Sequence, residues 1–264
     1  MQITTYQLDK DRVFDRVLEL SKIGKVGQKG VQRLALSKED KEAQSLVSVW
    51  MEEAGMEVRL DHFGNLIGRK EGSRPDSPVI MLGSHIDTVP NGGRFDGTIG
   101  VIGAIEVVHA INEAQISHDP SIEVVAFCEE EGSRFQSGFF GSKGMTGKIE
   151  RSDLSKEDEQ GINRYQALKA FGVNPDKIEK SVRTPEEIKL YLEMHIEQGP
   201  YLEANDCPIG IVKGIASFTW LRITIKGQAG HAGTVPMNLR KDPMVGAAEI
   251  IKEIEAICKD DPTG

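Results

Sequence analysis

The sequence predicts an α/β fold with a mostly parallel sheet, on three observations. PVIMLGSHID and SIEVVAFCEEEG each contain a short, nearly continuous apolar run, which is typical of a strand buried on both faces. YLEMHIEQGP is a third candidate strand. Residues 99–114, between the first two runs, have the pattern of a helix with small residues where it meets a sheet. Strand, helix and strand in this order favour helices layered on a sheet.

The other elements of this first part of the chain follow from local patterns. Apolar side chains at helical spacing predict helices over residues 8–22 and 38–54, the second with Ser37 as its N-cap. MEVRLDHFGNLIGRK is expected to form two short strands around a Gly-Asn turn. The polar, charge-rich stretch 150–187 is interpreted as surface helices and loops.

The pattern changes at about residue 212, which indicates a second domain. TWLRITIKGQ alternates apolar and polar side chains, as a half-exposed strand does. A helix is predicted over DPMVGAAEIIKEIEAICKD, with Asp242 as its N-cap. We therefore expect one domain over residues 1–211 and the start of a second, smaller one over 212–264. One strand and one helix cannot bury much of a core by themselves.

The composition excludes several classes of function. The chain has 264 residues and a formal net charge of −9, which argues against a nucleic-acid or anionic membrane surface. No apolar run is long enough to predict a membrane span, and the first 20 residues lack the pattern of a signal peptide. The three widely spaced cysteines, Cys128, Cys207 and Cys258, favour free thiols in a reducing compartment. We expect a cytoplasmic protein with no membrane or nucleic-acid partner.

Three of the predicted strands end in groups that bind metals. The first ends in His85-Ile86-Asp87, the second in Glu129-Glu130-Glu131, and the third in His195. Because the carboxyl ends of parallel strands meet at one edge of a sheet, these side chains are expected to converge. Mixed nitrogen and oxygen ligands suit Zn²⁺, Mn²⁺ or Co²⁺. The sequence therefore predicts a metal site, with the exact metal left open.

Two further acids fit the same site. Asp96 lies in a glycine-rich loop just before a predicted helix, where a carboxylate is able to bridge two ions. Asp87 lies two residues after His85 and is expected to orient the imidazole by accepting its second ring N–H. With two ions, hydrolysis is the expected reaction, and one acid should remain off the metals to move the proton. Spacing alone does not say which acid that is.

Simpler interpretations compete with the metal site. A His-x-Asp at one strand end is commonly a hydrogen-bonded structural pair, and three consecutive acids are commonly a solvated surface. Ionised together at the end of an apolar strand, however, Glu129, Glu130 and Glu131 repel one another unless a cation or protonation relieves them. Cys128 as a thiol nucleophile is disfavoured because no Cys/His motif surrounds it. The combined pattern favours the metal site.

Four ordered motifs carry a resemblance to a known family. GSHIDTVPNGGRFDG, FCEEEGSRF, HIEQGP and GQAGHAGTVPMNLRKDP resemble di-metal amidohydrolases that cut carbamoyl and ureido groups. That family includes allantoate amidohydrolases, N-carbamoyl-L-amino-acid hydrolases and β-ureidopropionases, and it is related to di-zinc aminopeptidases and aminoacylases. The resemblance implies a metallopeptidase-like catalytic domain, an inserted α+β lid or dimerisation domain, and a homodimer. It also implies two divalent ions and a small ureido or carbamoyl substrate.

The family pattern assigns the metal ligands residue by residue. It implies that His85, Asp96 and His195 hold one ion. It further implies that Asp96 bridges to a second ion, which Glu131 also binds. In the block that contains Glu131, the form Glu-Glu-Gly-Ser-Arg-Phe resembles the carbamoyl-cleaving branch rather than the peptidases.

The same pattern assigns the catalytic roles. It implies that Glu130 is the general acid and base, that Gln198 contacts the substrate, and that His231 binds the substrate and stabilises the oxyanion. FCEEEGSRF followed by GSKGMTG resembles allantoate amidohydrolases most. The expected reaction is therefore hydrolysis of allantoate to a ureidoglycine-type product, ammonia and carbon dioxide. An N-carbamoyl-L-amino acid is the alternative substrate.

Members of that family are substantially longer than this chain. Their later segments supply a last histidine for the second ion, together with an asparagine and an arginine that hold the substrate. No histidine follows His231 in this sequence. We therefore expect a C-terminally truncated chain with a complete first metal site, a weak second one and little or no turnover. An inactive metal-binding fragment is the alternative to an enzyme.

Overall fold

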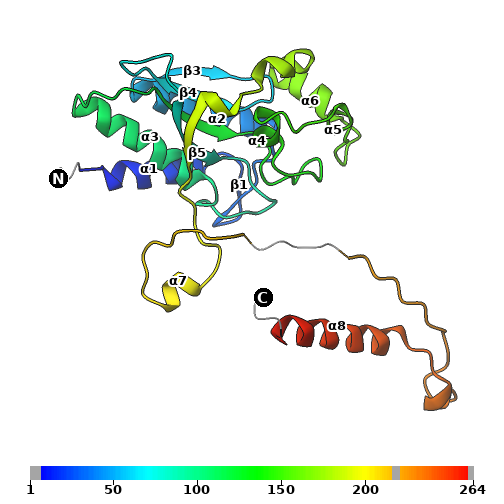
Figure 1. The fold of residues 1–264 in the computed structure, drawn as a ribbon. Coiled ribbons are helices and arrows are strands. Elements are labelled where there is room, and N and C mark those ends of the chain that lie inside the picture. Colours follow the sequence, from blue (N-terminus) through cyan, green and yellow to red (C-terminus); the bar gives the residue numbers. More distant parts are fainter. Residues whose placement is uncertain (1–6, 216–220, 261–264) are drawn as a thin grey trace. The chain divides into compact units, whose positions relative to one another are not determined.

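The structure is a computed structural model that describes residues 7–215 and 221–260 (Figure 1). The chain forms two compact units, Met1–Gln198 and Gly199–Gly264. The first unit thus ends at Gln198, before the boundary predicted after residue 211. Assignment of the second segment as a lid or dimerisation domain stays a prediction.

A five-stranded sheet organises the first unit. Its order is β3-β4-β6-β5-β7, in which β5 pairs in parallel with both β6 and β7, while β4 is antiparallel to β3 and β6. The predicted α/β fold is confirmed, and the sheet is mixed because the hairpin around the Gly-Asn turn joins its edge. The strands are β3 (Glu57–Leu60), β4 (Leu66–Lys70), β5 (Val79–His85), β6 (Ile122–Phe127) and β7 (Ile188–Leu192).

Three helices cover one face of this sheet, and all three are predicted by the sequence. They are α1 (Lys10–Leu20), α2 (Lys38–Glu53) and α3 (Thr98–Glu113). The Ser37 side chain accepts the amide of Asp40, which confirms the predicted N-cap of α2. Val47, Ile105 and Val124 belong to the core between these helices and the sheet. This core fixes the position of β5 and α3, whose facing ends carry candidate ligands.

A second core, which the sequence analysis missed, is formed by residues outside the five strands. The opposite face of the sheet carries a smaller cluster, in which Ile67, Met81 and Val125 pack against Met145. The stretch 150–187 was expected to lie at the surface, yet Leu168 and Phe171 are buried in the second core against Phe63 and Phe140. The polar majority of the stretch hides these few apolar positions, which is why composition alone suggested a surface. The elements here are α4 (Phe140–Met145), α5 (Arg151–Leu154), α6 (Arg164–Phe171), η1 (Pro175–Ser181) and η2 (Pro185–Glu187).

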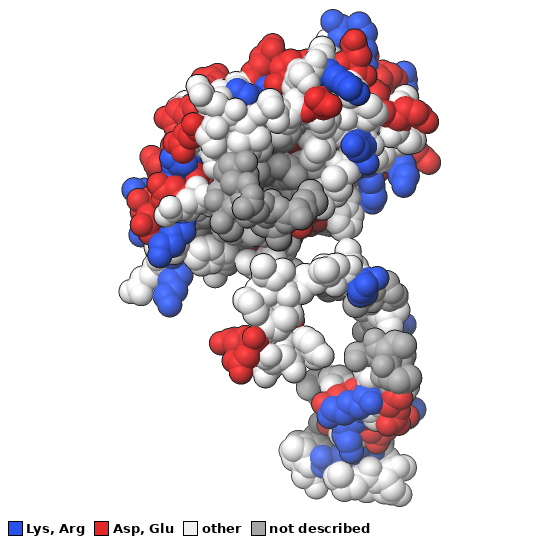
Figure 2. Space-filling view, turned by 60° about the vertical axis from the view of Figure 1, so that its left-hand side comes forward, with Lys and Arg blue, Asp and Glu red and all other residues white. Residues whose placement is uncertain are grey.

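A small two-stranded ribbon, which the sequence did not predict, completes the first unit. It consists of β1 (Lys25–Val26) and β2 (Gly30–Val31), paired antiparallel. On the face of the larger unit that Figure 2 presents, acidic and basic side chains are interspersed.

The second unit contains α7 (Tyr201–Ala204), η3 (Met237–Leu239) and α8 (Pro243–Asp260). The predicted helix is confirmed, and the Asp242 carboxylate accepts the Met244 amide at 2.9 Å, as an N-cap does. The strand predicted in TWLRITIKGQ is wrong over residues 221–228, which have no strand pairing, and residues 219–220 lie outside the described ranges. Across the described residues, the helices are too short or too polar to cross a bilayer.

Candidate metal centre

His85 is the last residue of β5 and is buried with its ring inside the protein. Its Nδ1 lies 3.0 Å from the backbone carbonyl of Asp87, so Nδ1–H donates to that oxygen. The tautomer that this hydrogen bond selects leaves a lone pair on Nε2. A lone pair held in a fixed direction is what a metal ion requires of a histidine.

A glycine lets the next candidate ligand approach His85. Asp96 precedes α3, and Gly97 follows it with φ +62°, in the left-handed region that favours glycine. A Cβ at residue 97 would lie only 2.4 Å from His85 Nε2. The Asp96 carboxylate therefore reaches the histidine only because residue 97 has no side chain.

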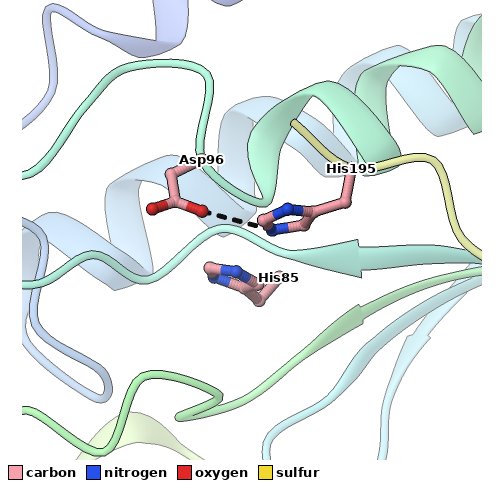
Figure 3. A group of neighbouring side chains, drawn as sticks. All are labelled: His85, Asp96 and His195. Carbon is pink, nitrogen blue, oxygen red and sulfur yellow. Dashed lines mark ion pairs between the residues drawn. The ribbon is translucent and has the colours of Figure 1, made fainter. Parts of the chain in front are cut away.

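His195 completes a group of three side chains from separate segments (Figure 3). Its Nε2 lies 3.2 Å from Asp96 Oδ1, and its ring stacks beside that of His85 with centroids 5.9 Å apart. Nδ1 of His195 lies 2.8 Å from the carbonyl of Ile196, so Nε2 again carries the lone pair. The sequence analysis placed His195 at the end of a strand, but β7 ends at Leu192 and a short extended segment delivers the imidazole.

These three residues fit a divalent cation. Within the described chain, Asp96 Oδ1 is buried without a hydrogen-bond partner. It lies 3.2 Å from His195 Nε2, which accepts the Gly97 amide at 3.3 Å, and two acceptors at this distance repel unless a cation or proton lies between them. Ligand atoms of His85, Asp96 and His195 all lie within 4.8 Å of one another. Two imidazoles and a carboxylate suit Zn²⁺, Mn²⁺ or Co²⁺.

A second group shares His85. It adds Glu130 and Glu131 from the loop after β6, with ligand atoms again within 4.8 Å. Glu130 Oε2 lies 3.6 Å from His85 Nε2. Burial raises the pKa of both carboxyl groups, against a lowering effect of His85. The structure thus brings together the two acids that the family pattern separates into a metal ligand and a proton carrier.

Asp87 has a different contact from the one predicted. His85 Nδ1 donates its hydrogen bond to the backbone carbonyl of Asp87. The Asp87 carboxylate Oδ1 lies 3.7 Å from the same nitrogen. That carboxylate instead accepts the amides of Glu130 and Glu131, both at 3.2 Å. Burial raises the pKa of Asp87 to about 6, against the lowering effect of these hydrogen bonds. Asp87 therefore links the end of β5 to the acidic loop.

The two remaining predicted residues lie in different surroundings. Gln198 donates from Nε2 to Asp96 Oδ2 at 2.7 Å, so it lies at the metal centre. Its contact with a substrate stays a prediction. His231 belongs to the other compact unit, where its Nδ1 accepts the Gly233 amide at 3.1 Å. Its proposed action on the substrate stays a prediction as well.

The comparison with known families agrees with this arrangement. The profile described as peptidase family M20/M25/M40 matches residues 81–263, which include every predicted site residue. The chain belongs to peptidase family M20/M25/M40. Enzymes of this family are metal-dependent, and His85, Asp96 and His195 form a group that could hold a metal ion.

Individual relatives place this M20/M25/M40 member near carbamoyl-cleaving proteins. An N-carbamoyl-L-amino-acid amidohydrolase of Pseudomonas sp. (strain NS671) is 61% identical over 98% of this chain and 63% of its own length. An allantoate deiminase of Arabidopsis thaliana is 39% identical over 93% of this chain and 48% of its own length. A hydantoinase/carbamoylase family amidase from Burkholderia ambifaria has a similar structure, with TM-score 0.78 and 36% identity over 97% of this chain and 62% of that one. The predicted resemblance is confirmed, and the chain spans less than two thirds of each relative.

Two residues of this M20/M25/M40 site escaped the sequence analysis. Gly97 was interpreted only as part of a glycine-rich loop. Its place between an acid and a helix is the signal that the backbone here approaches another side chain closely. Glu129 was grouped with its neighbours as a metal-binding acid. The structure buries it completely and pairs it with Arg164 Nε at 2.8 Å. Burial raises the pKa of Glu129 to about 7, against the lowering effect of Arg164.

The thiol beside these acids is unsuited to nucleophilic chemistry. Cys128 is buried, and burial raises the pKa of its thiol well above the usual range. Cys207 and Cys258 are exposed. In the folded protein we expect a thiol reagent such as DTNB to label Cys207 and Cys258 rapidly and Cys128 at least about 100 times more slowly. Rapid labelling of Cys128 without unfolding would contradict this assignment, and labelling in denaturant is the control.

Proposed function

We propose that this chain forms part of an enzyme that hydrolyses the carbamoyl or ureido C–N bond of a small carboxylate. The observation that carries this proposal is the buried Asp96 Oδ1, which has no hydrogen-bond partner and lies 3.2 Å from His195 Nε2, in a group with His85 and beside two acids of raised pKa. The similarity to carbamoyl-cleaving relatives supports the same reaction.

The described residues divide the work as follows. His85, Asp96 and His195 would hold one ion. The resemblance to di-metal amidohydrolases implies that Asp96 and Glu131 would contribute to a second. When bound, such ions supply polarisation of the carbonyl group and lower the pKa of water. Mn²⁺, Zn²⁺ and Co²⁺ all suit this set of donors.

Glu130 is the proton carrier in this proposal. Its carboxyl group has a raised pKa because it is partly buried, and a raised pKa makes the carboxylate a better proton acceptor. It accepts a proton from the attacking water and delivers it to the departing ammonia. The carbamate that remains releases carbon dioxide. Gln198, held on Asp96 Oδ2, is positioned to contact the substrate beside the ligands.

An N-carbamoyl-L-amino acid is the substrate that the similarity supports best. Identity is 61% to the Pseudomonas N-carbamoyl-L-amino-acid amidohydrolase and 39% to the Arabidopsis allantoate deiminase. Allantoate is the second candidate, because FCEEEGSRF followed by GSKGMTG resembles allantoate amidohydrolases. Both molecules carry a ureido group on a carbon that also bears a carboxylate. The same binding groups in a pocket would therefore suit either substrate. A cytoplasmic homodimer remains the expected setting.

Ammonia release from the two substrates tests the proposal. The 264-residue chain is assayed alone and joined to the C-terminal remainder of the Pseudomonas relative, each loaded with Mn²⁺. We expect the joined protein to favour N-carbamoyl-L-amino acids by at least about tenfold in kcat/KM. A preference for allantoate would reverse the substrate assignment. Absence of hydrolysis of either substrate by a folded, metal-loaded joined protein would contradict the proposed function.

A further inference from the structure

The loop that carries Glu130 and Glu131 is closed by its own backbone. We call residues 128–141 the acid loop. The carbonyls of Cys128, Glu129 and Glu130 accept the amides of residues 141, 140 and 139 at 2.8, 3.1 and 2.9 Å. Glu129 has φ +53°, a conformation that is costly for a residue with a side chain. Something outside this backbone ladder must therefore hold residue 129 in place.

The Glu129 side chain supplies that restraint through the hydrogen bonds of its carboxylate. It is fully buried, whereas Glu130 and Glu131 keep partial exposure beside His85. Glu129 Oε1 accepts the amide of Phe135 at 3.1 Å, which ties the start of the acid loop to its middle. Glu129 Oε2 accepts Nε of Arg164 at 2.8 Å. Both carboxylate oxygens are thus committed to structure.

Arg164 reaches this position from α6 and has no access to solvent. Its guanidinium lies against the rings of Phe135 and Phe140, at 4.9 and 4.4 Å from their centroids. It also donates to the carbonyl oxygens of Asp153 and Ser137. In so apolar a pocket an unpaired charge of either sign is strongly disfavoured, so Arg164 and Glu129 hold each other.

We infer that Arg164 and Glu129 form a positioning pair that aims Glu130 and Glu131 at the metal centre. This inference rests on the proposed function of those two acids. The acid loop is held from opposite sides, by the Asp87 carboxylate on the amides of Glu130 and Glu131 and by Arg164 on the side chain of Glu129. The stretch 150–187 was predicted to form surface helices and loops. Through Arg164 it helps to hold the acid loop, and with it Glu130 and Glu131, in position.

If Arg164 and Glu129 act as a positioning pair, variants of the two residues should differ in metal binding in a way that general destabilisation does not produce. Arg164→Met leaves the Glu129 carboxylate buried and unpaired, so residue 129 must move and its two neighbours move with it. Glu129→Gln leaves Arg164 unpaired in the same pocket. In the double variant both charges are absent, and glutamine still offers an acceptor to the Phe135 amide. Arg164→Lys keeps the positive charge at the same place.

Co²⁺ binding to the full 264-residue chain measures the effect. Affinity is obtained by titration, ligand geometry from the visible Co²⁺ absorption, and folding from thermal unfolding. Each single neutral variant is expected to bind Co²⁺ about tenfold more weakly with an altered absorption band. The double variant and Arg164→Lys are expected to recover to within about threefold of the parent chain. Arg16→Met is the matched control, because buried Arg16 pairs with Glu53 and stacks on Trp50 away from the acid loop.

The outcomes separate this inference from the proposed function. Folded Arg164→Met or Glu129→Gln with unchanged Co²⁺ affinity and absorption would overturn the positioning role, as would an equal loss in Arg16→Met. If Arg164→Met does not fold, Glu129→Gln and the double variant decide by the same criteria. A parent chain that binds no Co²⁺ would overturn the proposed metal site and, with it, this inference.

Discussion

Gly97→Ala is expected to weaken Mn²⁺ or Co²⁺ binding by at least about 100-fold, equivalent to about 2.7 kcal/mol. The new Cβ would lie 2.4 Å from His85 Nε2, the ring nitrogen that would bind the ion. Alanine at φ +62° is also strained, so the loop has two reasons to move Asp96 away from the histidine. Titration of the purified variant with Co²⁺, followed by its visible absorption, measures the loss.

The control for Gly97→Ala lies in the same loop. A Cβ at Gly93 meets no heavy atom within 4 Å, and this glycine does not have a positive φ. Gly93→Ala is therefore expected to bind metal as the parent chain does. If Gly97→Ala folds and keeps the parent affinity, the close approach of Asp96 to His85 is not needed for the metal centre.

Glu130→Gln is expected to lower kcat by about 10³-fold while the protein keeps its metals. Glutamine has nearly the shape of glutamate but cannot accept and return a proton. The metal centre retains His85, Asp96 and His195, so the metal content should be unchanged. Ammonia release by the chain joined to the C-terminal remainder of the Pseudomonas relative gives kcat, and elemental analysis gives the metal content.

A charge-matched control accompanies this change. Glu52 is exposed near the end of α2, and Glu52→Gln removes one negative charge outside the acid loop. We expect its kcat to equal that of the parent. Loss of metal in Glu130→Gln would instead assign Glu130 as a ligand, and full activity would assign the proton transfer to another group.

Local and periodic features of the fold were predictable from the sequence. The apolar runs before His85 and before Cys128, with a helix between them, define β5, α3 and β6. Parallel strands bring their carboxyl ends together, so the convergence of His85 with Glu130 and Glu131 also follows from sequence order. Asp96 and His195 were also singled out from the residues, the family resemblance added their assignment to one ion, and the structure brings both to the same centre.

The features that the sequence did not predict correctly depend on interactions between residues distant in the sequence. Residues beyond Leu192 leave the sheet, where Glu193 accepts Ser84 Oγ at 2.5 Å and Tyr191 Oη at 2.8 Å. Such side-chain contacts do not appear in an apolar pattern. Likewise, Glu129 resembles its acidic neighbours until Arg164, 35 residues later, is placed beside it. The alternation in residues 221–228 is not sufficient for a strand, because a strand also needs a partner.

The metal content of the purified chain tests the central claim most directly. The parent and Asp96→Asn are loaded with Mn²⁺, passed through gel filtration and measured by elemental analysis. We predict that the parent retains at least about one ion per chain and that Asp96→Asn retains less than about a tenth of that amount. Asparagine preserves the size of the side chain but removes the buried charge that faces His195. A parent chain without metal, or an Asp96→Asn variant with unchanged metal content, would contradict the account.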